Sequence, residues 1–198
     1  MLPGTDTTPS APRVARAATG WALLVLGLLG LAAAFVLAVE RVMLLADPDY
    51  IPSCSLNPVL SCGSVMTTEQ AQVLGFPNPF IGIVAFTVVV TTAVVVLAGA
   101  ALPRWYWAGL AIGSVLGLAF VHWLIYQSLY SVNALCPYCM VVWAVQLPLT
   151  IIAVGRAWPP GKLAEAVAPW RWHILVIWYV IVVALIAERF WYYWSTLI

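Results

Sequence analysis

The sequence predicts an all-α protein embedded in a membrane. Of its 198 residues, 64% are hydrophobic and only 8% are charged, whereas a soluble domain is about half apolar and about a quarter charged. Five apolar runs are long enough to cross the hydrocarbon core, which takes about 20 helical residues. The 11 tryptophans and 8 tyrosines suit the aromatic belts of membrane interfaces. The net charge of +1, with no basic patch, argues against a nucleic-acid partner.

The predicted spans cover residues 20–45, 80–102, 105–131, 136–154 and 173–194. The first is longer than a signal-peptide core of roughly 7–15 residues and no clean cleavage site follows it, so we expect it to be retained. Residues 1–19 are rich in Pro, Thr, Ala and Arg, which predicts a disordered cytoplasmic tail. Residues 20–198 then form one transmembrane domain, whose longest outer loop is 46–78.

The positive charges predict how the chain is oriented. With five spans, one side of the membrane carries Arg13, Arg16, Arg104, Arg156, Lys162 and Arg171. Cytoplasmic loops hold the excess of Lys and Arg, so this side and the amino terminus should be cytoplasmic, in a plasma or inner membrane. The loop 46–78 and the turn 131–135 then face outward. All four cysteines lie in or beside these segments, at the extracytoplasmic face, where disulfides persist.

Two local patterns predict how segments fold and pack. Residues 67–70, Thr-Thr-Glu-Gln, resemble a capping box and predict a short helix over 68–74 that lies on the membrane surface. Gly109, Gly113 and Gly117 recur at every fourth position, which predicts the close approach of a neighbouring helix.

The motif Cys136-Pro137-Tyr138-Cys139 begins the fourth span and carries the strongest chemical signal. Pro137 suits the first helical position, where its missing N–H costs nothing. The free N–H groups and the positive end of the helix dipole favour thiolate over thiol, so both cysteines should be reactive. Cys139 lies one turn deeper on the same face. We expect Cys136 to meet other protein thiols and Cys139 to meet a reactant in the bilayer.

Cys54 and Cys62 form a second pair in the outer loop, and they can close a small disulfide loop. Alone, this disulfide is equally well explained as a brace for an exposed loop. Beside the C-x-x-C motif it also makes a relay, because a thiolate of one pair can attack the disulfide of the other. A four-cysteine zinc site is the main chemical alternative. The oxidising side of the membrane disfavours it, and we predict no metal.

Electrons that reach Cys139 need an acceptor, and the sequence has no haem motif or dinucleotide fingerprint. A small lipophilic oxidant such as a quinone fits a pocket inside a helical bundle, with apolar walls and one or two polar groups. Asn78 is a candidate polar group, although its place before Pro79 also suits a helix N-cap. The candidate aromatic wall residues, which are also typical of interfacial belts, are Phe80, Trp123, Tyr126 and Tyr130.

These motifs, in this order and spacing, resemble the vitamin K epoxide reductase family, particularly bacterial members that form disulfides with a quinone. The resemblance rests on residues 54–58 (Cys-Ser-Leu-Asn-Pro), 62–66 (Cys-Gly-Ser-Val-Met), 76–82 (Phe-Pro-Asn-Pro-Phe-Ile-Gly) and 134–139 (Ala-Leu-Cys-Pro-Tyr-Cys). It implies a four-helix bundle around a quinone of the menaquinone, ubiquinone or vitamin K type, with a fifth transmembrane helix beside it.

The resemblance also implies a role for each site residue. Cys139 would face the quinone, and Asn78 would hydrogen-bond one of its carbonyls. Cys136 would exchange with Cys62. Cys54 would accept electrons from a reduced partner and pass them to Cys62. The implied activity is a membrane oxidoreductase that makes disulfides in extracytoplasmic proteins and reduces the membrane quinone pool.

The sequence departs from the family in two places. Many bacterial members carry a thioredoxin-like domain after the fifth helix, whereas this chain ends at Ile198. We therefore expect the partner to be a separate thioredoxin-fold thiol oxidase of the DsbA type. The animal enzymes have a tyrosine where this chain has Trp143, which weighs against epoxide reduction. The alternatives are a vitamin K quinone or epoxide reductase, and a non-catalytic membrane scaffold braced by disulfides.

Overall fold

The computed structural model describes residues 13–158 and 168–196, and this part of the chain is helical with no β-strand. The helices long and apolar enough to cross a membrane are α1 (Arg13–Ala46), α3 (Pro79–Leu97), α4 (Arg104–Tyr126), α5 (Pro137–Ala157) and α7 (Arg171–Arg189). The shorter elements are α2 (Cys62–Met66), η1 (Glu69–Gln72), η2 (Gln127–Val132), η3 (Ala168–Trp170) and α8 (Trp191–Trp194). The predicted all-α membrane fold is confirmed.

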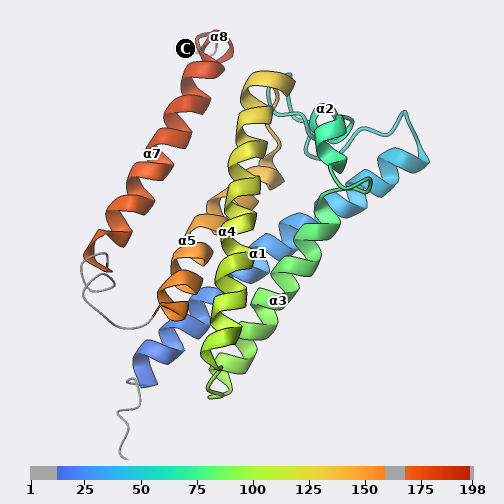
Figure 1. Ribbon diagram of the computed structural model, residues 1–198. Helices are drawn as coiled ribbons and strands as arrows, with labels where there is room; N and C mark the ends of the chain where they lie inside the picture. The colour runs from blue at the N-terminus through green and yellow to red at the C-terminus, as the bar shows by residue number, and fades with distance from the viewer. Residues whose placement is uncertain (1–12, 159–167, 197–198) are drawn as a thin grey trace, which may run out of the picture.

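Four of the long helices form a bundle, and α7 stands beside it (Figure 1). α1 packs along α3 and α5, and α4 packs along α5. Leu23, Phe86, Trp107 and Leu149 are buried where these helices meet. Lipid is as apolar as these side chains, so close packing rather than the hydrophobic effect holds the helices together.

Glycines set how closely α1 approaches α3. A Cβ at Gly30 would collide with the ring of Phe86, and a Cβ at Gly20 would lie 2.7 Å from the side chain of Leu97. Because real Cβ atoms do not approach other atoms so closely, a larger residue at either position would force the side chain of Phe86 or Leu97 to shift. The small residues that allow close packing therefore lie on α1.

The close packing predicted at the glycines of α4 is wrong for two of the three. A Cβ at Gly109 or Gly113 would have no neighbour within 4 Å. Only Gly117 has a close neighbour, the side chain of Gln146 on α5. The reason is geometric: α4 packs on α5, while the face that carries Gly109 and Gly113 looks into a space between α4 and α3.

α1 begins earlier than the sequence predicts. Residues 13–19 are helical, so the expected disorder of the tail 1–19 is wrong for this stretch, and residues 1–12 lie outside the described part of the chain. Ala and Arg, both good helix formers, make up most of the segment 13–19. The Arg16 guanidinium donates a hydrogen bond of 3.4 Å to the carbonyl of Gly99, which ties the start of α1 to the end of α3.

Backbone carbonyls of α5 and η2 hold α7 against the bundle. Pro148 lies inside α5 and has no N–H, so the carbonyl of Ala144 lacks its helical donor. The Tyr179 hydroxyl of α7 donates to this carbonyl at 2.6 Å. Beyond α4, Arg189 Nε donates to the carbonyl of Leu129 at 2.8 Å. Unpaired carbonyls are costly in hydrocarbon, so both contacts favour the docking of α7.

The end of α7 also supports the turn that precedes Cys136. Arg189 Nη2 donates to the side chain of Asn133, whose φ of 55° places it in the left-handed region. Phe190 is fully buried in a cluster with Leu129 and Leu135. Arg189 and Phe190 therefore fix the backbone directly before the C-x-x-C motif.

The segment between α1 and α3 folds over one end of the bundle, which we call the cysteine end (Figure 1). The predicted capping box is wrong, because the Thr67 hydroxyl donates back to the carbonyls of Gly63 and Ser64 at the end of α2. The helical turn that follows is correspondingly short and covers only η1.

Candidate redox site

A short β-bridge joins two distant segments at the cysteine end. Leu60 and Leu135 form this parallel bridge, in which backbone hydrogen bonds of 2.7 and 2.9 Å link Leu135 to the other segment. The residues that follow are thereby set side by side. They are Cys62 at the start of α2 and Cys136 directly before α5.

One disulfide and two free thiols meet there. Cys54 and Cys62 are bonded to each other, while Cys136 and Cys139 are free. Cys62 Sγ lies only 3.0 Å from Cys136 Sγ, and neither residue is exposed. Exchange requires a thiolate beside a disulfide sulfur, and this contact provides that arrangement. Cys54 is 4% exposed, so the outer loop must shift before a thiol of another protein reaches it.

The same sulfurs are close enough to suggest a metal site. The Sγ atoms of Cys54, Cys62 and Cys136 lie within 4.8 Å of one another. A thiolate, however, is the form of cysteine that binds a metal, and two of these three sulfurs share a disulfide. The arrangement therefore favours exchange over coordination in this state.

Cys136 is the N-cap of α5, with Pro137 at the first helical position as the sequence predicts. A hydrogen bond from the Cys139 thiol lowers the pKa of Cys136, and the backbone N–H groups of Cys139 and Tyr138 lower it further. Burial and the charge of Glu40 oppose this effect, but the pKa remains below that of an ordinary thiol. Cys136 is thus the better nucleophile for attack on Cys62.

Glu40 of α1 fixes the loop that carries Cys54. Its buried carboxylate accepts hydrogen bonds from the Tyr50 hydroxyl at 3.0 Å, from the Ser53 N–H at 3.3 Å and from the Ser53 hydroxyl. The first of these bonds raises the pKa of Tyr50. Glu40 therefore holds the loop in place while its charge raises the pKa of Cys136.

A cavity of about 160 Å³ is lined by Cys139 and by residues of α1, α3, α4 and α5. Its wall is mostly apolar and includes Leu37, Met66, Phe86, Phe120 and Leu124. Polar atoms come from Cys139, Asn78, Trp143 and Gln146. An apolar concave space with a few polar groups is the usual form of a small-molecule site.

Asn78 lines this cavity but does not cap α3 with its side chain, so the predicted N-cap bond is absent. Asn78 Oδ1 accepts from Val73 N–H at 3.1 Å, and Nδ2 donates to the carbonyl of Gln70 at 2.7 Å. Its backbone has helical angles rather than the extended angles of an N-cap. The side chain instead ties η1 to the start of α3, which leaves one N–H of Nδ2 available.

The four aromatic residues predicted to line the pocket lie outside its lining. Phe80, Trp123, Tyr126 and Tyr130 are 37–58% exposed. Trp123 stacks on Phe120 on the surface of α4, and Tyr126 and Tyr130 contact each other. On α4 the cavity is lined by residues 117, 120, 121 and 124, which form one helical face. Trp123 and Tyr126 fall on other faces of α4, while Phe80 lies in α3 and Tyr130 in η2.

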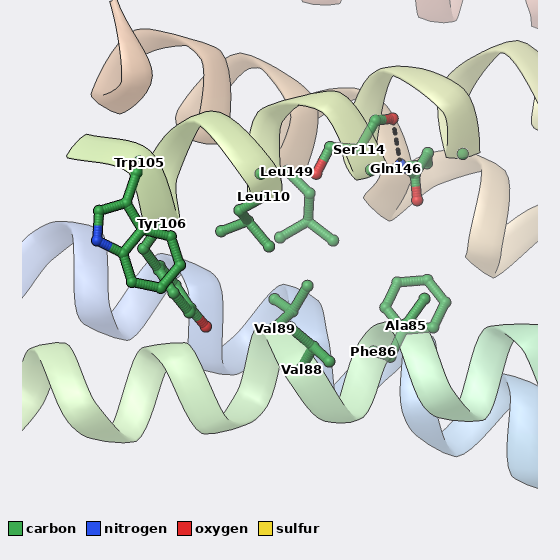
Figure 2. A pocket seen from close by; sticks show the side chains of 13 residues that line it. Ala85, Phe86, Val88, Val89, Trp105, Tyr106, Leu110, Ser114, Gln146 and Leu149 are labelled. Atoms are coloured by element: carbon green, nitrogen blue, oxygen red, sulfur yellow. Dashed lines mark hydrogen bonds between the residues drawn. The ribbon is translucent and has the colours of Figure 1, made fainter. Parts of the chain in front are cut away.

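A cleft of about 400 Å³ lies between α3 and α4 (Figure 2). Its walls are almost entirely apolar, and the bare backbone at Gly113 keeps it open. Trp105 and Tyr106 lie at one end and Phe86 lies toward the other. The Tyr106 and Thr92 hydroxyls are 2.6 Å apart and join α4 to α3 at the first end. The residues that line both the cleft and the cavity are Ala85, Phe86, Gly117 and Gln146, so the two spaces meet there.

Comparison with known proteins agrees with this geometry. The family model described as the vitamin K epoxide reductase family matches residues 21–154. The chain belongs to that family. A search of the curated proteins found no match. The matched stretch holds all four cysteines, α3, α4 and most of α5, so the family assignment covers every cysteine and every residue that lines the cavity. An oxidoreductase with a redox function of the vitamin K epoxide reductase type follows from it.

Sequence reasoning missed Gln146 as a site residue and treated Trp143 only as a departure from the family. Both line the cavity. The Trp143 indole Nε1 is buried and has no hydrogen-bond partner in the described part of the chain. The signal was present in the spacing, because Cys139, Trp143 and Gln146 follow at i, i+4 and i+7 on one helical face. A glutamine at the third of these positions is conspicuous in an apolar span.

The close approach of Cys62 and Cys136 predicts a trapped disulfide in Cys139→Ala. Cys136 attacks Cys62 and Cys54 leaves. Cys139 can no longer compete for Cys136, and blocking of the free thiols stops Cys54 from reversing the exchange. Peptide mapping of the protein, purified with free thiols blocked, should show this bond as a major species. Cys136→Ala is the matched control and should retain only Cys54–Cys62. A Cys139→Ala protein with an intact Cys54–Cys62 bond and a free Cys136 would contradict the geometry.

The charge of Glu40 predicts a shift in the pH dependence of Cys136. Glu40→Gln keeps an acceptor for Ser53 and Tyr50 but removes the charge that raises the pKa of Cys136. The midpoint of its alkylation by iodoacetamide, followed by mass spectrometry of the Cys136 peptide, should move to lower pH. Tyr50→Phe retains the carboxylate and should leave the midpoint near that of the wild type. An unmoved or higher midpoint in Glu40→Gln would show that the charge does not act on Cys136.

Proposed function

We propose that the protein is a quinone-dependent thiol–disulfide oxidoreductase that makes disulfides in extracytoplasmic proteins. The observation that carries the proposal is the 3.0 Å contact between the Cys54–Cys62 disulfide and Cys136, combined with the position of Cys139 in the wall of an apolar cavity. An oxidised pair touches a reduced pair, and the second cysteine of the reduced pair faces a site for a lipophilic reactant.

The residues fit a quinone by two criteria. The walls of the cavity are apolar, as a lipophilic ring requires. Polar groups without full hydrogen bonding lie in these walls: the Asn78 amide has one free N–H, and the Trp143 indole has no partner in the described part of the chain. A bound quinone supplies the electron acceptor, taking up two electrons and two protons. Asn78 would orient its ring beside Cys139.

The thiol chemistry balances over one cycle. Cys136 and Cys139 together lose two electrons and two protons and close a disulfide. A reduced partner protein then exchanges with Cys54–Cys62, leaving both as thiols and itself oxidised. Cys62 attacks Cys136, and Cys139 leaves and takes up a proton. Cys54 finally attacks Cys62, so Cys136 is released, and the arrangement seen in the structure is restored.

The donor in this proposal is a separate thioredoxin-fold protein of the DsbA type, which presents a thiol to the loop that carries Cys54. The proposed orientation places the cysteine end at the extracytoplasmic face of the plasma or inner membrane. Arg16, Arg104 and Arg156 lie at or near the opposite ends of their helices, and basic residues favour the cytoplasmic side. Partner thiols and the disulfides formed would then share one oxidising compartment.

The cleft between α3 and α4 supports an isoprenoid quinone as the acceptor. It continues from the cavity and is lined by apolar side chains of α3, α4 and α5. A ring held beside Cys139 would leave its hydrocarbon tail in this cleft. Gly109 and Gly113 supply the width, because no side chain fills the space there. The absence of a hydroxyl at Trp143 favours quinone reduction over epoxide reduction.

The proposal predicts quinone reduction that depends on Cys139. Purified protein, kept anaerobic with a reduced thioredoxin-fold protein as donor, should bleach the absorbance of added menaquinone or ubiquinone. Cys139→Ala should lower the rate to the uncatalysed background, since no second thiol remains to close the disulfide. Wild-type protein that reduces neither quinone, while its disulfide stays unreactive to the donor, would favour the scaffold alternative.

The cleft predicts a variant that distinguishes quinones by their tails. Gly113→Leu fills the cleft without a backbone clash, and we expect a roughly tenfold loss of kcat/KM for menaquinone, typical of an overpacked site. Reduction of dimethylnaphthoquinone, which has no tail, should stay within about twofold. Gly155→Leu is the matched control, because Gly155 is exposed on α5, its Cβ would meet nothing and it lines neither space. Equal effects on both quinones would place the tail elsewhere.

A further inference from the structure

Gln146 lies where the cavity and the cleft meet. It is on α5, two turns below Cys139 and on the same face. It is only 9% exposed, and it lines both spaces. A buried amide in a membrane span is costly unless its polar atoms are paired.

The amide nitrogen of Gln146 is fully engaged. Nε2 donates to the carbonyl of Ser114 at 2.9 Å and to the hydroxyl of Thr150 at 3.5 Å. The Thr150 hydroxyl shares its one proton between the same Ser114 carbonyl at 3.1 Å and the backbone carbonyl of Gln146 at 2.9 Å. These contacts fix which end of the amide faces α4, because the Ser114 carbonyl can only accept and so pairs with the amide N–H groups rather than with the amide oxygen. Both N–H groups of Gln146 are therefore committed within the protein.

The amide oxygen of Gln146 is not engaged. Oε1 has no hydrogen-bond partner among residues 13–158 and 168–196. Figure 2 shows it turned away from Ser114, into the space between α4 and α3. The absence of a side chain at Gly117 permits this position, since a Cβ there would lie 2.9 Å from Gln146 Nε2. The structure thus presents one accessible acceptor without a partner to whatever occupies the cavity.

An acceptor distinguishes between the two redox states of a quinone. The carbonyl oxygens of a quinone can only accept hydrogen bonds, so they gain nothing from Gln146 Oε1. The reduced form, a quinol, carries two hydroxyl groups that donate. We propose that Gln146 Oε1 accepts a hydrogen bond from the quinol and makes the site bind the reduced product more tightly than the quinone. The inference rests on the proposed function.

Such a preference would assist the thiol chemistry. A site that binds quinol more tightly than quinone shifts the equilibrium of the bound pair toward the reduced form by the ratio of the two affinities. Electrons are then drawn from Cys136 and Cys139, and the disulfide between them is favoured. Gln146 acts here as a positioning and specificity-determining residue, and it takes no part in electron transfer.

The test measures binding rather than turnover. In a Cys139→Ala background, which cannot complete the reaction, affinities for dimethylnaphthoquinone and dimethylnaphthoquinol are titrated anaerobically by quenching of tryptophan fluorescence. Gln146→Met has a similar volume but no acceptor. We expect it to weaken quinol binding roughly tenfold, the usual effect of losing a buried hydrogen bond, and to change quinone binding less than about twofold. Gln146→Leu repeats the test with a different shape.

Thr150→Ser is the matched control. It keeps the hydroxyl that accepts from Gln146 Nε2, and Thr150 lines neither space, so the ratio of quinol affinity to quinone affinity should be retained. Equal weakening of both ligands in Gln146→Met, or an unchanged ratio, would overturn the inference and leave the proposed function intact. If the Cys139→Ala protein with Gln146 intact binds neither ligand, the proposed function fails and the inference fails with it.

Discussion

The contact between Cys62 and Cys136 is the constraint on which the rest of the site depends. Their sulfurs are 3.0 Å apart although 74 residues separate them in the sequence. A single parallel bridge between Leu60 and Leu135 sets this approach. Two backbone hydrogen bonds alone hold the segments weakly, whereas thiol–disulfide exchange requires the sulfur atoms to be in contact. Other contacts must therefore hold the segments that carry Cys62 and Cys136.

Three separate groups provide that hold. Glu40 binds the loop before Cys62 through Tyr50 and Ser53. Arg189 and the buried Phe190 fix the turn before Cys136. Glu40, Arg189 and Phe190 each lie in a transmembrane helix or directly after one. The loops that carry the cysteines are therefore held by contacts with the transmembrane helices. The fifth helix thus belongs to the site although it forms no wall of the cavity.

The features that depend on residue type could be predicted from the sequence. The features that depend on which face of a helix points inward could not. The five spans and the reactive start of α5 follow from hydropathy and from Cys136-Pro137 alone. Trp123 and Tyr130 were misplaced, because an apolar helix without polar periodicity gives no indication of its inner face. Asn78 satisfied a capping pattern locally, but a tertiary contact with η1 used its side chain instead.

The glycines show why such patterns are ambiguous in membrane helices. A glycine can let another helix approach, as Gly30 does against Phe86, or it can keep a space open, as Gly113 does between α3 and α4. The sequence signature is the same in both cases, and only the neighbouring helix decides between them. Here α1 and α3 are in close contact while α3 and α4 are apart, so one side of the bundle gains rigidity and the other gains a cleft that opens from the cavity at Cys139. The closely packed helices α1 and α3 keep the thiols fixed, while the cleft between α3 and α4 lets a lipophilic reactant enter and leave. A redox site of this kind needs both.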